Sequence, residues 1–410
     1  MHHVADPRDV NRRSFCPMTP DTAISVSATR TCLCNADITA LKQVLSNTPN
    51  ARGLPNSAFT SDAFYDLERE LLFTRTWFCI GFASDIPDPG DVAPVWFGDL
   101  SILLVRGDDE AVRVFHNICP HRGMRLVREP AKNKRVIACP YHCWTFDKTG
   151  KLLRRPHFMG PGDAEGLPHE ADPPALKEIR SAIWGDAIMI NIDGKAPDFA
   201  EHTRHLDAAA APYGAVREGH NTDNIDYVID ANWKLIVENF IDSYHVKWVH
   251  KALEASTPMA TYNHETIGNI CVGRAPVAEA RAGYGGNMPG WPGLSQEAAG
   301  TLTYLALFPN LLLVFSNDRM TCFHLMPDGP GRSRERIKFY MPHDALMPEF
   351  ETERTECVES YRTLNDEDIW LVEELQQSRR SPAFDGGRFS PHWDRITHHF
   401  AKQVAEALLA

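Results

Sequence analysis

The sequence lacks the features of a membrane-spanning, secreted or nucleic-acid-binding protein. Its 410 residues contain no apolar run of the length, about eighteen residues, needed for a transmembrane helix. The first residues mix charges of both signs without an apolar core, so we expect no secretory signal. No basic cluster with interleaved aromatic residues occurs, and the net charge is −12. We therefore expect neither nucleic acid nor a membrane as a partner.

The sequence also lacks internal repeats, low-complexity segments and a recognisable flavin- or nucleotide-binding loop. Its ten cysteines are mostly isolated and do not form the pattern of a disulfide framework. We expect them to be thiols or metal ligands in a reducing cytoplasm. The composition, with 43% apolar and 23% charged residues, is that of a globular chain, and the length suggests about two or three domains.

Hydrophobic periodicity separates a strand-rich region from a region of mixed structure. Apolar residues at helical spacing predict helices over 36–46 and 61–75, the second with Ser61 as its cap. From Trp77 onward, short apolar runs between turn signals predict a compact all-β domain of about ninety residues. A Pro- and Gly-rich connector over 155–178 follows it.

Beyond the connector, strands between residues 183 and 340 are flanked by helices over 346–380 and 393–409, which indicates an α+β domain. We therefore predict an α+β chain with four parts. These are an N-terminal arm over 1–50, a helix over 51–80 that packs on the last domain, the all-β domain over 81–175 and the α+β domain over 176–410.

Two short Cys/His motifs predict a metal cluster in the all-β domain. Cys119-Pro-His121 and Cys139-Pro-Tyr-His142 each supply one thiolate and one imidazole. Two cysteines on one iron and two histidines on the other are the ligands of a Rieske 2Fe–2S centre. The alternative is a structural zinc site, but zinc sites usually use C-x-x-C pairs. The mixed pairs favour the Rieske cluster.

A second metal site is indicated by His245 and His250, with Asp242 three residues before the first. On an ideal helix, residues five apart diverge by about 140°. The two histidines can therefore reach one ion only if the helix ends or widens between them. Asp242 shares a face with His245 and can accept a hydrogen bond from the imidazole nitrogen that does not bind metal.

The third ligand of such a site must come from elsewhere in the chain. Asp368 lies on one helical stripe with Leu364 and Val372, whereas Asp366, Glu367 and Glu373 are expected to face solvent. An acid on the buried face of a helix needs a cation. The alternative is that the acidic run simply begins a helix, where the dipole favours it. Two histidines and one carboxylate are the ligands of non-haem Fe(II) oxygenases.

Together these motifs resemble the catalytic (alpha) subunit of the Rieske non-haem iron, or aromatic-ring-hydroxylating, oxygenases. The similarity runs from about residue 55 to 400. It rests on C-P-H-R-G at 119–123, C-P-Y-H at 139–142, the 232–250 segment and E-D-I-W-L-V-E from 367. The resemblance implies an N-terminal Rieske domain and a C-terminal helix-grip (START-like) catalytic domain.

The resemblance also implies the cofactors and partners. The cofactors would be a Rieske 2Fe–2S cluster and a mononuclear Fe(II). A separate NAD(P)H-dependent reductase, with or without a ferredoxin, would supply electrons for the oxidation of a small organic substrate by O2. Asp242 would link His245 to a cluster histidine of the neighbouring subunit, in a homotrimer or an α3β3 assembly. The implied cluster ligands are Cys119, His121, Cys139 and His142, and the implied iron ligands are His245, His250 and Asp368.

Substrate and cluster environment remain open at the level of sequence. The family usually has Gly where Cys143 follows the second cluster histidine, so we expect a changed cluster environment there. We expect an aromatic substrate, because Asp242 is the acid that the ring-hydroxylating enzymes use. The alternative is a quaternary ammonium compound of the choline, carnitine or betaine type, which would need an aromatic cage. Candidates for this cage are Tyr262, Trp291, Tyr304, Phe308, Phe315 and Phe323.

Two other functions would also fit parts of the pattern. A Rieske electron carrier without oxygenase activity would use the cluster but not His245. A zinc-stabilised binding module on a helix-grip fold would hold zinc and no iron.

Overall fold

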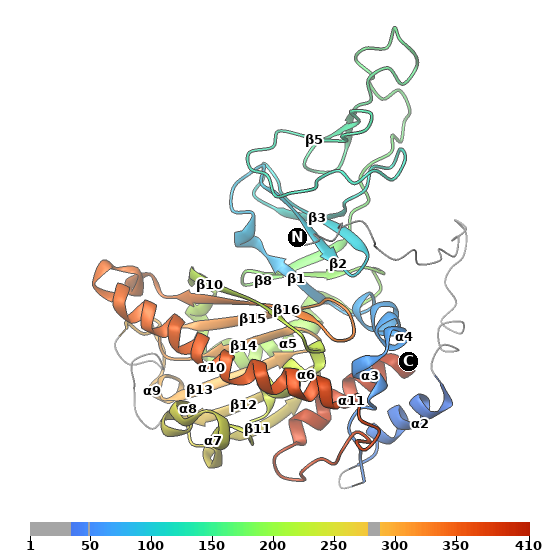
Figure 1. Ribbon diagram of the computed structural model, residues 1–410. Coiled ribbons are helices and arrows are strands. Elements are labelled where there is room, and N and C mark those ends of the chain that lie inside the picture. Colours follow the sequence, from blue (N-terminus) through green and yellow to red (C-terminus); the bar gives the residue numbers. More distant parts are fainter. Residues whose placement is uncertain (1–33, 48–49, 278–287) are drawn as a thin grey trace, which may run out of the picture.

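The computed structural model describes residues 34–47, 50–277 and 288–410 (Figure 1). Most of the predicted arm over 1–50 lies outside these residues. The described chain has a small β domain that projects from a larger domain of sheet and helices (Figure 1). The predicted α+β class is confirmed. No helix in the described part of the chain is long and apolar enough to cross a membrane.

The projecting domain consists of two small antiparallel sheets around their own core. One sheet has the order β2-β3-β4 and the other β5-β6-β7. Apolar side chains from both sheets pack together with Cys119 and Cys139, which are buried. The strands are β2 (Val92–Phe97), β3 (Leu100–Arg106), β4 (Val112–His116), β5 (Ile137–Ala138), β6 (Thr145–Phe146) and β7 (Leu152–Arg154).

A third small sheet connects this domain to the rest of the chain. It has the order β1-β9-β8, built from β1 (Phe78–Phe82), β8 (Arg180–Trp184) and β9 (Ala187–Asn191). A tight turn joins β8 to β9, and Gly185 takes a φ of 57° there, which Gly adopts without steric cost.

The larger domain is built on a seven-stranded antiparallel sheet of order β10-β16-β15-β14-β13-β12-β11. Neighbouring residues of a strand face opposite sides, so Leu312 and Val314 belong to one core and Leu311 and Leu313 to another. The strands are β10 (His220–Ile229), β11 (Asn263–Ile267), β12 (Ile270–Pro276), β13 (Thr301–Leu307), β14 (Leu311–Phe315), β15 (Met320–Pro327) and β16 (Ser333–Met341).

Helices cover both sides of this sheet. The long helix α10 (Glu351–Ser378) runs across one face beside α6 (Trp233–Ile241), with α11 (Arg395–Leu409) next to them (Figure 1). The core on this face includes residues of all three helices. The helix α5 (Phe199–Ala210) packs on the opposite face. The shorter helices are η2 (Ala83–Asp85), η3 (Ala211–Glu218), α7 (Val246–Val249), α8 (Lys251–Ser256), η4 (Met259–Thr261), α9 (Gln296–Ala299), η5 (His343–Leu346) and η6 (Pro348–Phe350).

Both predicted N-terminal helices are present. The first is α2 (Asn35–Val44), and a short α3 (Ser57–Thr60) follows it. The second begins as α4 (Asp62–Leu67), and the Ser61 hydroxyl accepts a hydrogen bond from the Phe64 backbone. It continues as a π-helical segment, η1 (Glu68–Phe73), and packs on α11 and α6 of the larger domain.

A buried ion pair joins η1 to α6, the helix that leads into the predicted iron site. The Lys234 ammonium lies 2.6 Å from a Glu68 carboxylate oxygen, and both side chains are completely buried. The Trp233 indole donates to the other carboxylate oxygen at 3.1 Å. Because both charged groups are buried away from water, each needs the opposite charge of the other to offset the loss of hydration.

We expect Lys234→Met to lower the free energy of unfolding by about 3–5 kcal/mol, because it leaves the Glu68 carboxylate buried without its cation. Urea denaturation followed by tryptophan fluorescence measures the change. The double variant Glu68→Gln/Lys234→Met removes both charges and should recover most of the loss. Equal destabilisation of the single and double variants would contradict this account.

Candidate metal centres and active site

The two histidines of the predicted iron site meet because the helix between them ends. The α6 helix begins after Asn232, whose side chain accepts from the Lys234 backbone, and it ends at Ile241. Asp242 then takes an extended conformation with ψ of 121°. A new helix, α7, begins after His245 and ends before His250. The geometric condition set by the five-residue spacing is thus met by a break in the helix.

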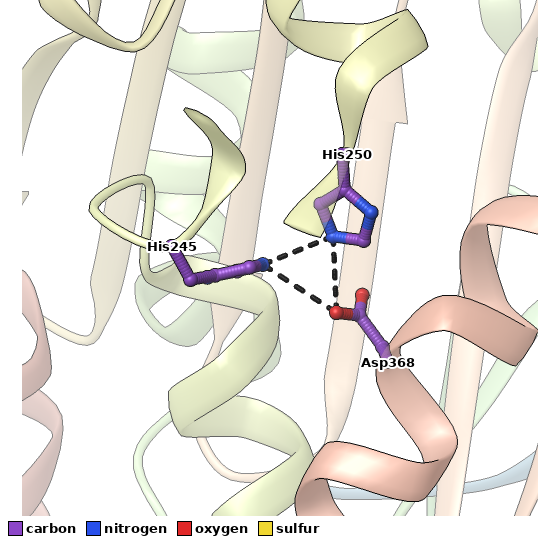
Figure 2. Close-up of side chains that lie close together, drawn as sticks. All are labelled: His245, His250 and Asp368. Atoms are coloured by element: carbon purple, nitrogen blue, oxygen red, sulfur yellow. Dashed lines mark hydrogen bonds and ion pairs between the residues drawn. The ribbon is translucent and has the colours of Figure 1, made fainter. Parts of the chain in front are cut away.

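Three donor atoms from two distant segments converge on one point (Figure 2). The Nε2 atoms of His245 and His250 lie 3.0 Å apart. The nearer Asp368 carboxylate oxygen, Oδ1, lies 3.0 Å from His250 Nε2 and 3.4 Å from His245 Nε2. Asp368 is part of α10. It lies 118 residues after His250, so the site joins two segments that are distant in the sequence.

Carboxylates on the far side of each imidazole fix its tautomer. His245 Nδ1 donates to Asp242 at 3.0 Å, and His250 Nδ1 donates to Glu367 at 2.8 Å. The hydrogen on each Nδ1 leaves each Nε2 with an unshared electron pair. Two nitrogen lone pairs and a carboxylate oxygen therefore face one another, an arrangement that a cation at their centre stabilises.

The protonation equilibria of the metal-free site show the same demand for positive charge. Burial lowers the pKa of His245, but hydrogen bonds to Asp242 and Asp368 outweigh it and raise the pKa to about 9. Burial raises the pKa of Asp368, but its two histidine neighbours reverse the effect and bring it to about 2. Two nitrogens and one carboxylate with open space beside them fit a mononuclear Fe(II).

Glu367 has a role that the sequence did not reveal. We expected it to face solvent, and its side chain is indeed 40% exposed, yet it bends back to His250. The signal in the sequence was indirect. His245 has an acid three residues before it, whereas Lys247 stands three residues before His250. The carboxylate that orients His250 therefore had to come from another segment.

The cluster motifs form two loops with the same hydrogen bonds. The Cys119 carbonyl accepts from Gly123 N at 2.9 Å, and the Cys139 carbonyl accepts from Cys143 N at 3.0 Å. Each cysteine N–H also donates five residues ahead, to the carbonyls of Met124 and Trp144. The chain thus presents two equivalent cysteines from two equivalent turns.

The two cluster histidines lie next to each other with their rings in an edge-to-face arrangement. The ring centroids of His121 and His142 are 4.7 Å apart, and Trp144 stacks on His121 at the same distance. The Nδ1 atoms of both histidines are buried without a hydrogen-bond partner. Two buried, unsatisfied imidazole nitrogens beside two buried cysteines fit the ligand set of a Rieske cluster.

A cavity with an aromatic wall adjoins the three converging donor atoms. Five of its lining residues form an unbroken series of ring contacts, with centroid distances of 5.8, 5.9, 5.2 and 6.2 Å. In order, this aromatic wall is Tyr262, Tyr304, Phe240, Phe323 and Tyr361.

Three of the six aromatic residues considered from sequence lie in this wall, namely Tyr262, Tyr304 and Phe323. Trp291 and Phe315 lie in the core on the opposite face of the sheet, and Phe308 packs against Phe400. Phe240 and Tyr361 were not anticipated. They come from helices α6 and α10, whose inward faces are set by tertiary packing.

Comparison with known protein families matches both domains. Residues 76–161 match the model of the Rieske [2Fe-2S] domain, and residues 216–410 match that of the ring hydroxylating alpha subunit (catalytic domain). The chain belongs to the Rieske non-haem iron oxygenases. It is accordingly a terminal oxygenase component, with a Rieske 2Fe–2S cluster and a mononuclear iron as cofactors, and it needs a reductase, O2 and a small-molecule substrate.

Proteins similar to this chain are named for different substrates. The chain is 26% identical to a chloroplastic choline monooxygenase of Atriplex hortensis, over 84% of this chain and 76% of that protein. It is also 26% identical to the carnitine monooxygenase oxygenase subunit of Escherichia coli K12, over 83% and 88% of the two chains. In fold it is similar to naphthalene 1,2-dioxygenase from Rhodococcus, with a TM-score of 0.74, 19% identity and coverage of 92% and 99%.

The repeated loop geometry predicts that Cys143→Gly stabilises the oxygenase. Gly123 takes a φ of 68° and Cys143 takes a φ of 55° at equivalent positions. This region costs a non-glycine residue about 1–2 kcal/mol, part of which the greater unfolded-state freedom of Gly offsets. We expect a net gain of up to about 1 kcal/mol, measured as a higher thermal midpoint with the cluster absorption retained. Cys143→Ser keeps the strained backbone and should show no gain; a gain of equal size in Ser would refute the explanation.

The hydrogen bond between Glu367 and His250 Nδ1 should contribute to iron binding. We expect Glu367→Ala to weaken Fe(II) binding about 10- to 100-fold, because the His250 tautomer and ring position lose their partner. Glu367→Gln keeps an oxygen that can accept from Nδ1–H and should retain more affinity than Ala. Titration with Fe(II) of protein that keeps the cluster but lacks the mononuclear iron measures both variants, with unchanged cluster absorption as the folding control. Iron affinity that is the same in Ala and wild type would show that Glu367 has no such role.

Proposed function

We propose that this oxygenase oxidises a quaternary ammonium compound in the aromatic-walled cavity beside His245, His250 and Asp368. In this proposal these three residues hold the mononuclear iron, and Cys119, His121, Cys139 and His142 hold the Rieske cluster. The observation that carries it is the convergence of three unshared electron pairs next to a cavity lined by five aromatic rings.

Held by these residues, the two iron centres would supply the redox chemistry, with one-electron transfer from the cluster and O2 activation at the mononuclear site. The protein supports this chemistry with its own groups. Asp242 and Glu367 hold the two imidazoles in the metal-binding tautomer. The aromatic rings of the cavity exclude water and orient the substrate.

We further propose that electrons pass between subunits of a homotrimer or an α3β3 assembly. The strand β5, which leads into the second cluster loop, lies in the projecting domain above β2 and β3, whereas α7 lies at the opposite end of the molecule, beyond the seven-stranded sheet (Figure 1). The Asp242 side chain is 25% exposed, so its outer edge can be reached by a neighbouring subunit. An exposed aromatic residue lies near each site between which electrons would pass: Tyr141 is in a cluster loop, and Trp248 is in α7 beside the iron site.

A cytoplasmic location is part of the proposal. The cluster needs Cys119 and Cys139 as thiolates, and a reducing compartment keeps cysteines in that state.

An aromatic compound is the second candidate substrate. It is favoured by Asp242, the acid that the ring-hydroxylating enzymes use, and by the aromatic wall, on which a planar ring can stack. A quaternary ammonium group is also attracted to the faces of aromatic rings. We rank a quaternary ammonium substrate first because the chain is similar in sequence to choline and carnitine monooxygenases across most of its length.

Oxygen consumption with a donor reductase distinguishes the two substrates. We expect choline, glycine betaine or carnitine to stimulate O2 uptake and to yield a product derived from oxygen insertion, traced with isotopically labelled O2. Asp368→Ala should abolish the stimulated uptake while keeping the cluster. Stimulation by aromatic acids alone would reverse the ranking. A wild-type enzyme that oxidises no compound of either class would overturn the proposal.

A further inference from the structure

Of the charged groups among the described residues that line the cavity, all except Glu335 either have a partner in the protein or belong to the iron site. Arg319 is paired with Asp318 at 2.6 Å, and Asp242 is hydrogen-bonded to His245. Asp368 faces the two histidines of the iron site. Glu335 also lines the cavity, but among the described residues no cationic side chain lies within ion-pair distance of it, and its charged neighbour is Asp368.

Glu335 occupies this position because of the register of the sheet. On β16 it is paired with Tyr227 of β10 and with Leu325 of β15. Its side chain lies on the same face as Ile337 and Phe339, two and four residues further along β16, which belong to the core on the α10 side. This face is the floor of the cavity, and α10 lies across it.

The carboxylate is buried and has one polar neighbour. Glu335 is 3% exposed, and its Oε2 accepts a hydrogen bond of 2.7 Å from the Asn365 amide. Asn365 lies three residues before Asp368, on the same side of α10 and about one turn away along the helix axis. Through Asn365, the Glu335 carboxylate is therefore held about one helical turn from the iron site. Its other oxygen has no hydrogen-bonding neighbour in the described part of the chain.

A carboxylate in such a position is costly unless it meets a cation. Burial raises the pKa of Glu335 to about 7, and the Asn365 amide opposes this shift only in part. The charged form is therefore poorly stabilised by the protein itself. A positive charge brought in by a ligand would compensate it.

We propose that Glu335 determines substrate specificity by binding the cationic group of a quaternary ammonium substrate. This inference rests on the proposed function and names the group that recognises the charge. A quaternary ammonium ion has no N–H to donate, so it needs a negative charge and polarisable surfaces rather than directed hydrogen bonds. Glu335 provides the charge, while Phe323 and Tyr361 belong to the aromatic wall of the same cavity.

The test compares choline with 3,3-dimethylbutan-1-ol, in which a carbon replaces the charged nitrogen. Dissociation constants are measured by calorimetry on wild type and Glu335→Gln, both loaded with iron. Gln keeps the size of Glu335 and can still accept from Asn365, so the variant changes mainly the charge. Equal cluster absorption and iron content establish that both proteins are folded. Glu374→Gln, an exposed position on the same helix as Asn365, is the matched control.

We expect wild type and Glu374→Gln to bind choline at least about tenfold more tightly than the neutral alcohol, and Glu335→Gln to lose most of this preference, with the remainder supplied by the aromatic wall. The affinity for the neutral alcohol should be unchanged in all three proteins. A preference for choline that is as large in Glu335→Gln as in wild type would overturn the role of Glu335 while leaving the proposed substrate class intact. An equal loss of affinity for both ligands would also overturn it, because it would show a structural role. No preference in wild type would refute the substrate class itself.

Discussion

The catalytic half of this protein depends on the mutual orientation of two imidazole rings. Each ring is held by a carboxylate on its Nδ1 side, Asp242 for His245 and Glu367 for His250. These two hydrogen bonds determine that both Nε2 lone pairs point at the same place, where Asp368 adds a third donor. Without a positive charge at this point, like partial charges would face one another at about 3 Å, so the site has affinity for a cation; the raised pKa of His245 shows a proton meeting the same demand.

The rest of the larger domain can be understood as the support of this arrangement. The break after Ile241 turns His245 toward His250, and α10 carries both Asp368 and Glu367 across the sheet. The buried pair of Glu68 and Lys234 ties α6 to the N-terminal helices. The same crossing of α10 over the sheet encloses the cavity, so the metal site and the substrate site share one wall.

Much of the metal chemistry could be predicted from the sequence, because it is encoded by local spacing. Cys119, His121, Cys139 and His142 lie within two short loops, and residue type and spacing identify a Rieske centre. Asp368 could be selected because it shares a helical stripe with apolar residues. The five-residue spacing of His245 and His250 predicted that the helix must end or widen if both are to reach one ion, and in the structure α6 ends before His245.

The features that were not predicted depend on pairing between distant segments. Glu367 reaches His250 across 117 residues, and only the position of α10 shows this. Glu335 lines the cavity because of the register of β16 with β15 and β10, and a shift of one residue would turn it to the other face. Phe240 and Tyr361 join the aromatic wall through helix packing. In the proposed function, Glu335 and the aromatic wall recognise the substrate, which is why the sequence alone did not identify it.

The central claim is that one chain holds two separate iron centres, the second on His245, His250 and Asp368. Iron content of the reconstituted protein, measured together with the cluster absorption, tests it most directly. The account predicts about three irons per chain in wild type and about two in Asp368→Ala, with the same cluster spectrum in both. Three irons retained in Asp368→Ala, or only two in a wild type with an intact cluster, would contradict it.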